Sequence, residues 1–517
     1  MLQLLDFPPE LIDRILLHVD SPRDLISFAC ASQMCKSYAV PHRYRSIRVT
    51  GRSKLGLWGY LASRTDLAKH VRSIRVGTLT SDEPWGGNGQ IHISYLGLRP
   101  GVLQATGDNI LRSLEQMSNL TTFQWALTME KLCASSQALS LLEVVARRPL
   151  LRGLQLSSES LSSAFQEALQ DPGHSIWRMK NLEWLELDML GKPHPVASDA
   201  NLGGWLRQLP SLTLFSTTSR IFVGQCLNLS FPALKQLAIV TSDKDSQGDI
   251  DAIAYFLQNH ASIEEFSWVM SPCLPVVLQP GCLPNLKKLA CQMPFLEAME
   301  AAFTAQMSSA PPQPPSRYKL EELHIYPAHT WYPSGQDVGK LRSFRFLDGL
   351  HLRSLHFTPS GSFSTLCKLS VFPNLEKLEM PSGKLCPSSQ PGMSKWVTFL
   401  PRFKNLRVLE GYAVWDIDTS QSPWIGADVE AIEYTVQILG RYCPKLKRLS
   451  YPKEQVPGKD PLLQIDILRS TMASTSEIIS YSVEVLTSRQ GPSFRPYPPS
   501  WINSAVIVGE QITGNAR

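Results

Sequence analysis

The 517-residue sequence has few features of a membrane, nucleic-acid-binding or disulfide-rich protein. No apolar run approaches the roughly 20 residues that a membrane-spanning helix needs. The formal charge of +5 is small for this length, and no cluster of Lys and Arg marks a nucleic-acid surface. The ten cysteines include no CxxC pair, which excludes the usual zinc spacings and a small disulfide scaffold. We expect reduced cysteines and a cytoplasmic and/or nuclear protein.

Motifs for catalysis are also lacking. The sequence has neither the G-x-S-x-G turn of hydrolases nor the H-E-x-x-H metal motif. A stretch similar to a phosphate-binding loop, at 335–340, is one residue too short and lacks the Ser or Thr that binds magnesium. The pairs His324/His329 and His351/His356 are each five residues apart, so neither pair shares a helix face. We therefore predict no enzyme activity, no cofactor and no metal.

What the sequence does contain begins with three short amphipathic helices within residues 7–42. The run Pro-Pro-Glu at 8–10 is typical of a helix start. A second helix is expected from Pro22, and a third from about Ser32 to Val40, which ends before Pro41. Helices of this size bury too little surface to be stable alone. They must therefore either cap the next domain or be completed by another protein.

This stretch resembles the F-box, especially the versions found at the start of many fungal proteins. The matching residues are Phe7-Pro8 for the usual Leu-Pro, Glu10-Leu11, Ile15-Leu16, Asp24-Leu25 and the apolar third helix. The resemblance implies that residues 1–45 dock on a Skp-family adaptor, which bridges to a cullin–RING ubiquitin ligase. It implies an adaptor-facing surface made of Phe7, Pro8, Leu11, Ile15, Leu16 and Leu25. Cys35 stands where many members have Trp, which leaves open a vestigial F-box that serves only as an N-terminal cap.

Beyond these helices one short phrase recurs: an apolar residue, two polar residues, an apolar, a polar and an apolar residue. Clear copies are LEWLEL (182–187), LKQLAI (234–239), LEELHI (320–325) and LEKLEM (375–380). Successive copies lie mostly about 22 to 34 residues apart, which is the range of leucine-rich repeats with insertions. Residues 46–451 thus resemble a degenerate leucine-rich repeat array, without the usual Asn after each strand.

The predicted fold class is α/β: a small three-helix F-box followed by an irregular leucine-rich-repeat-like solenoid with a parallel strand face. Helix, turn and strand are expected in this order at 249–266, 394–409 and 429–449. Insertions are expected near 77–108 and 305–319. Residues 452–517 are expected to cap the open end, through short ordered pieces at 465–472, 477–486 and 501–508, and to include a partly flexible tail.

In each repeated strand the apolar residues point inward, and the residues between them line the concave face. The predicted target-binding residues are Trp184, Glu186, Asp188, Glu322, His324, Tyr326, His356, Lys377 and Glu379. Trp184 and Tyr326 stand out, because large aromatic residues are favoured at interfaces. Basic residues are few on this face, so a phosphorylated target motif is not favoured.

Together with the resemblance, these patterns predict a non-catalytic, substrate-recognition subunit of a Skp–cullin–F-box type ubiquitin ligase. The helices would bind the adaptor, and the repeats would hold a target protein near the ubiquitin-carrying enzyme. The alternative is a protein-interaction scaffold with a vestigial F-box. No set of residues supports a third class, a hydrolase or nucleotide-binding enzyme.

Overall fold

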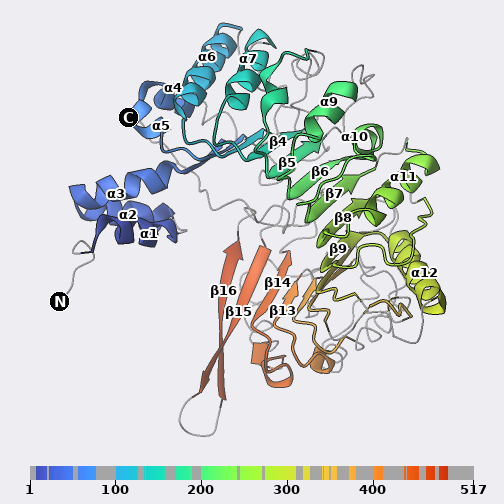
Figure 1. Ribbon diagram of the computed structural model, residues 1–517. Helices are drawn as coiled ribbons and strands as arrows, with labels where there is room; N and C mark the ends of the chain where they lie inside the picture. Colours follow the sequence, from blue (N-terminus) through green and yellow to red (C-terminus); the bar gives the residue numbers. More distant parts are fainter. Residues whose placement is uncertain are drawn as a thin grey trace. The chain divides into compact units, whose positions relative to one another are not determined.

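The computed structural model describes helices, strands and connecting turns along most of the chain (Figure 1). The described residues are 7–19, 22–49, 56–76, 100–125, 133, 135–157, 171–188, 199–241, 245–270, 274–309, 318–326, 341, 343–347, 351–357, 372–379, 400–410, 436–437, 439–452, 462–471 and 477–486.

Three helices open the described chain: α1 (Pro9–Leu17), α2 (Pro22–Ala31) and α3 (Gln33–Tyr44). They share a small core formed by Ile12, Leu16 and Leu25, against which Val19, Phe28 and Tyr38 pack. Ser32 caps α3, because its hydroxyl accepts a hydrogen bond from the backbone N–H of Cys35 at 3.0 Å. The structure therefore has the three predicted helices.

The third helix is longer than predicted. Its expected end before Pro41 is wrong, because α3 continues through Pro41 to Tyr44. A proline inside a helix removes one hydrogen bond and costs about 3 kcal/mol. Packing on both sides of the proline offsets this cost, since Ala39 and Tyr44 are buried. Strand β1 then begins at Ser46, so α3 leads almost directly into the sheet.

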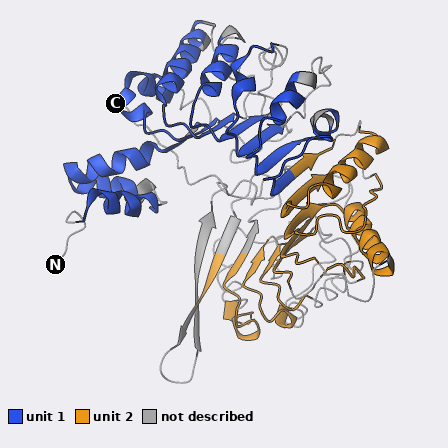
Figure 2. Ribbon diagram, viewed as in Figure 1, with its two compact units in different colours: residues 1–80, 90–237, 500–517 blue, residues 81–89, 238–499 orange. Residues whose placement is uncertain are grey.

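The described residues form two compact units (Figure 2). Those up to residue 237 belong to unit 1, and those from residue 238 belong to unit 2. The boundary falls within strand β7 (Gln236–Val240). The three N-terminal helices thus share unit 1 with the first repeats.

In unit 1 the strands run parallel, in chain order and in register. They are β1 (Ser46–Val49), β2 (Ser73–Val76), β3 (Thr122–Trp125), β4 (Gly153–Ser157), β5 (Trp184–Asp188) and β6 (Leu214–Thr218). Helical segments connect them: α4 (Gly56–Ser63), α5 (Thr65–Ala68), α6 (Pro100–Gln116), α7 (Ser135–Ala146), the 3-10 turn η5 (Ser175–Arg178) and α9 (Asp199–Leu206). The helix α10 (Ser219–Gln225) follows β6.

Unit 2 continues the same pattern, with parallel strands in chain order. They are β8 (Glu265–Val269), β9 (Lys288–Cys291), β10 (Glu322–Ile325), β11 (Ser354–Phe357), β12 (Lys377–Glu379), β13 (Val408–Glu410) and β14 (Arg448–Pro452). Its helical elements are α11 (Gln247–Gln258), α12 (Met293–Ser309) and the 3-10 turn η8 (Leu400–Arg402). Figure 1 shows α11 and α12 along one side of β8 and β9.

The recurring phrase folds as predicted, since each quoted copy contains a strand. Its second apolar residue stacks on the same residue of the next repeat, as register partners that are all buried. In unit 2 this row is Leu289, Leu323, Leu355, Leu378, Leu409 and Leu449. A single strand and helix could not bury this surface alone, but stacked repeats form a continuous core. Each unit therefore has the α/β architecture of a leucine-rich repeat solenoid.

The predicted insertions near 77–108 and 305–319 extend too far. Helix α6 already begins at Pro100, and α12 continues to Ser309. Both helices carry core residues, for example Leu114 and Phe303, which are buried. Residues 77–99 and 310–317 lie outside the described part of the chain.

Two long antiparallel strands, β15 (Leu462–Thr471) and β16 (Glu477–Leu486), follow the parallel strands of unit 2. They match the ordered pieces predicted at 465–472 and 477–486. The first five residues of β15 pair with β14, so the parallel run ends at a strand of opposite direction. The predicted piece at 501–508 lies outside the described residues.

Candidate functional site

One face of α1 leaves large apolar side chains in solvent. Phe7 is 39% exposed, Leu11 is 43% exposed and Ile15 is 44% exposed. Leu11 and Ile15 are four residues apart and lie on one face of α1, and Phe7 lies just before the N-cap residue Pro8. The helices thus have a core of their own and, beside it, an apolar surface that they do not cover. We call these three residues the α1 stripe.

Two residues predicted for the adaptor-facing surface do not belong to it. Leu16 and Leu25 are 4% and 5% exposed and lie in the internal core. Their apolar character therefore serves the packing of the helices against one another. Pro8 is exposed and occupies the N-cap position of α1. The prediction missed Ile26 and Met34, which are also exposed; helical spacing measured from Leu25 would have placed Ile26 outside the core.

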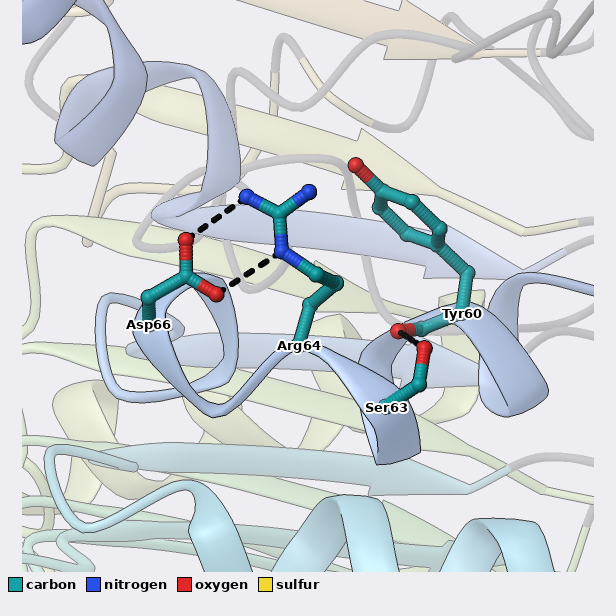
Figure 3. Close-up of polar contacts among 4 residues, drawn as sticks. All are labelled: Tyr60, Ser63, Arg64 and Asp66. Atoms are coloured by element: carbon teal, nitrogen blue, oxygen red, sulfur yellow. Dashed lines mark hydrogen bonds and ion pairs between the residues drawn. The ribbon is translucent and has the colours of Figure 1, made fainter.

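Polar contacts join the N-terminal helices to one another and to the first repeat. His42 Nε2 of α3 lies 2.7 Å from Asp13 Oδ1 of α1. Tyr44, the last residue of α3, is hydrogen-bonded to Tyr60 of α4, and its pKa is raised by burial and by this bond. Next to Tyr60, Arg64 donates two hydrogen bonds to Asp66, at 2.9 and 2.7 Å (Figure 3).

These contacts have a direct electrostatic consequence at the surface. The hydrogen bond with Asp66 raises the pKa of Arg64, and the same bond lowers the pKa of Asp66. The Arg64 guanidinium also lies 5.8 Å from the ring centre of Tyr60, within the range of a cation–π contact. The end of α3 is linked to α4 through the hydrogen bond between Tyr44 and Tyr60, beside this charged pair.

The second candidate surface is the strand face, the side of each sheet that carries the third and fifth residues of the repeated phrase. In unit 1 one of its predicted residues is buried and another lies against the neighbouring strand. A Cβ atom at Gly153 would lie 2.5 Å from Cε3 of Trp184, so the indole ring covers that glycine. Glu186 is only 3% exposed. The side chain of Asp188 lies outside the described part.

In unit 2 the strand face brings predicted residues into contact. His324 on β10 and His356 on β11 are register partners, and their ring centres are 3.5 Å apart. The ring of Tyr326 lies 4.5 Å from that of His324. Tyr326 itself is buried, so it supports the stack and does not act as the exposed anchor that was predicted. Burial, and then the neighbouring His356, lower the pKa of His324 well below its ordinary value.

The stack continues into charged groups on the next two strands. His356 Nδ1 lies 3.0 Å from one carboxylate oxygen of Glu379. The ammonium group of Lys377 lies 3.1 Å from the other oxygen and 2.7 Å from Glu410. Burial raises the pKa of Glu379, but His356 and Lys377 outweigh it and lower the pKa to about 2. Burial lowers the pKa of Lys377, but Glu379 and Glu410 outweigh it and raise the pKa.

A similar arrangement lies three strands away. The ammonium group of Lys288 on β9 is 3.4 Å from Glu265 on β8 and 3.5 Å from Glu322 on β10. Each of these two lysines is therefore flanked by two carboxylates from the strand face. Register explains the juxtaposition, since Glu265, Lys288 and Glu322 are successive partners across the strands.

The carboxyl group of Glu379 on this face is unsuited to proton transfer near neutral pH. A carboxyl with a pKa of about 2 is ionised near neutral pH and is a poor general acid or base there. Within the described residues, no group of three or more His, Cys, Asp and Glu side chains could hold a metal ion. The described helices also include none that is long and apolar enough to cross a membrane.

Sequence reasoning placed His324 and His356 on the strand face but did not bring them together. They lie 32 residues apart, and only the register of β10 with β11 makes them neighbours. A usable signal was present, since each is the fifth residue of its copy, LEELHI or LRSLHF. His324 and His356 thus form a stacked pair, of which His356 lies 3.0 Å from Glu379.

Comparison with known proteins gives only distant similarities. No protein-family model and no curated protein matches the chain. Among solved structures, it is similar to the yeast Rad7 and Elc1 complex at 12% identity, covering 81% of this chain and 92% of that chain with a TM-score of 0.32. An internalin from Listeria monocytogenes has 13% identity, 65% and 75% coverage and a TM-score of 0.27. The protein LegL7 from Legionella pneumophila has 10% identity, 69% and 89% coverage and a TM-score of 0.29. At these scores the similarities carry no argument about function, and the solenoid assignment rests on the parallel, in-register strands.

Proposed function

We propose that this protein is a non-catalytic substrate receptor of an F-box type ubiquitin ligase. The observation that carries the proposal is the α1 stripe: three helices with a core of their own leave Phe7, Leu11 and Ile15 in solvent on one side. A monomer gains nothing from this arrangement, whereas a partner that covers the stripe would bury apolar surface. The resemblance of residues 7–42 to the F-box supports a Skp-family adaptor as that partner.

The strand face of unit 2 supplies the second half of the function. It presents partly exposed charged groups on successive strands, and no described group of three or more His, Cys, Asp and Glu side chains there could hold a metal ion. In the proposed mechanism the adaptor binds α1, the strand face holds a target protein, and the ligase transfers ubiquitin to a nearby lysine of the target. The contribution of this chain is proximity, which converts a bimolecular encounter into a local one.

The test is co-purification of the full chain with a Skp-family adaptor. The variant Leu11→Asp plus Ile15→Asp places two charges in the apolar contact. Each substitution should cost about 1.5–3 kcal/mol of contact energy, so the complex should weaken by about 100-fold or more. The helices should remain folded, because their core does not include these two residues.

A matched control is available in unit 1. Val102 and Leu150 are 46% and 45% exposed, close to the values for Leu11 and Ile15, and lie elsewhere on the unit. Val102→Asp plus Leu150→Asp should leave adaptor binding unchanged. Undiminished capture of the adaptor by the α1 variant would contradict the proposed docking surface.

One observation favours the alternative, in which the helices are a vestigial F-box that caps the solenoid. Helix α3 contacts β1 and α5, and Tyr44 is bonded to Tyr60, so the helices already cover the first repeat. Cys35, at the position of the usual Trp, is buried. A well-folded wild-type chain that captures no adaptor would establish this second function, that of a free-standing interaction scaffold.

A further inference from the structure

The strand face of unit 2 has two negatively charged brackets, each a lysine held between two carboxylates. The first is Lys288 with Glu265 and Glu322, and the second is Lys377 with Glu379 and Glu410. Each bracket has a net charge of about −1 with all groups ionised. The outer carboxylates remain accessible, because the side chains of Glu322 and Glu410 are 38% and 26% exposed.

The negative charge is a local property of this face. The chain as a whole has a formal charge of +5. Arg448 and Asp466 on the neighbouring strands pair at 2.9 Å and cancel one another. The stacked His324 and His356 lie between the brackets, on β10 and β11. Along the strand face of unit 2, the described side chains at the third and fifth positions of β8 to β13 therefore carry excess negative charge at the two brackets. The imidazole rings of His324 and His356 lie between these two places.

We propose that this face binds a basic, extended segment of the target protein, with one cationic side chain at each bracket. The inference rests on the proposed function as a receptor and names the chemical class of its target. The two lysines stand on β9 and β12, three strand spacings apart, which is about 14 Å. Four residues of an extended chain span about the same distance. The segment thus carries Lys or Arg at positions i and i+4 and crosses the strands above the histidine rings.

Charge complementarity also predicts which segments this face should bind poorly. An acidic or phosphorylated segment would meet four carboxylates, whose neighbouring cationic groups, the two lysines and, when protonated, His356, are already paired with them. A basic segment can share these carboxylates at their exposed edges. Because the groups are partly exposed, binding should weaken as salt is added.

The experiment uses the full chain and two fluorescein-labelled peptides that differ only in charge. The basic probe is Gly-Lys-Ser-Gly-Ser-Lys-Gly, and the acidic probe has Glu in place of both lysines. Fluorescence anisotropy at low and at physiological ionic strength measures binding. The basic probe should bind at least about tenfold more tightly than the acidic probe, and added salt should weaken its binding.

Three variants test whether the basic probe binds at the two brackets. Glu322→Gln plus Glu410→Gln should weaken binding of the basic probe about fivefold or more, because one accessible charge is lost from each bracket. Lys377→Met should strengthen it severalfold, since the internal competitor for Glu379 and Glu410 is removed. The control Glu264→Gln plus Glu376→Gln removes two charges from the lead-in position beside the strand face, where they pair with Lys287 and Arg407, and should have no effect.

The outcomes separate this inference from the proposed function. Equal binding of both probes, or the same loss in the control as in the bracket variant, would overturn it. Adaptor capture by the same preparations is measured in parallel. A chain that captures the adaptor but ignores the basic probe disproves the target class alone, whereas a chain that binds the probe but never the adaptor disproves the ligase role.

Discussion

At the scale of single residues, the repeated phrase determines which face a side chain occupies but not whether it stays exposed. Trp184 shows the difference. It lies on the predicted face of β5, but its ring lies over Gly153 of β4, where a side chain would otherwise stand. The sequence gives no direct sign of this pairing, because Gly153 and Trp184 become neighbours only through the register of two repeats.

The pairing predicts a strong effect of a small substitution. In Gly153→Ala the new methyl group would lie 2.5 Å from Trp184 and 2.9 Å from Thr122 Cγ2, so the indole ring must move. We expect a loss of about 1–3 kcal/mol in the free energy of unfolding, measured by urea denaturation. The control is Gly204→Ala in α9, where a Cβ atom meets nothing within 4 Å and helix propensity should stabilise by up to about 1 kcal/mol. Equal stability of both variants would mean that Trp184 is free to turn away.

At the scale of elements, the polar row across β10, β11 and β12 makes the stability of unit 2 sensitive to acid. The pKa of His324 is lowered in the folded protein, chiefly by burial. Below pH 6.5 the unfolded chain therefore binds more protons than the folded chain, and stability falls as the pH falls. The pKa of Glu379 is lowered to about 2 against an ordinary value of 4.5, so its contribution is lost as the pH falls from about 4.5 to 2.

Two variants test which residue causes the loss of stability in each pH range. His324→Phe keeps a flat ring without the titrating group and should flatten the stability curve just below pH 6.5. Glu379→Gln should flatten it between about pH 4.5 and 2, where the shift of roughly 2.5 pKa units corresponds to about 3 kcal/mol. Urea denaturation at a series of pH values measures both. Curves for wild type and His324→Phe that are parallel from pH 7 to 5 would show that His324 does not titrate abnormally.

Elements also show how far the sequence could predict the fold. The strands were predicted well, because each repeat presents the same apolar spacing and the copies support one another. The connections were predicted less well. Residues 100–108 lie within a predicted insertion but form the first half of α6. Pro41 was taken as a helix end, although α3 continues past it to the buried Tyr44. In both places packing against distant residues outweighed local preference.

At the scale of the whole repeat array, a row of charges runs along the lead-in to the strands, at the second position of the phrase. In unit 2 the residue at this position donates its backbone N–H to the carbonyl of the preceding one, at 2.7–2.8 Å for each successive pair from Lys287 to Lys447. Its side chains alternate in sign through six repeats and end with a second cation: Glu264, Lys287, Glu321, Arg353, Glu376, Arg407 and Lys447. Neighbouring repeats are therefore joined by opposite charges as well as by apolar contacts.

This alternation predicts that reversing one charge is worse than removing it. Glu376→Lys would place four cations in a row, because it joins Arg353 to Arg407 and Lys447, and should lower the melting temperature of unit 2 by a few degrees at low salt. Glu376→Gln should change it less, and added salt should reduce the difference between the two variants, because these groups are largely exposed. The double exchange Glu376→Lys plus Arg407→Glu restores that ion pair and sets the new carboxylate beside Lys447, while the new lysine lies beside Arg353. It therefore has one like-charge neighbour pair, as the wild type does, and should recover most of the loss. A melting temperature no higher than that of Glu376→Lys would contradict a stabilising role for the alternating row.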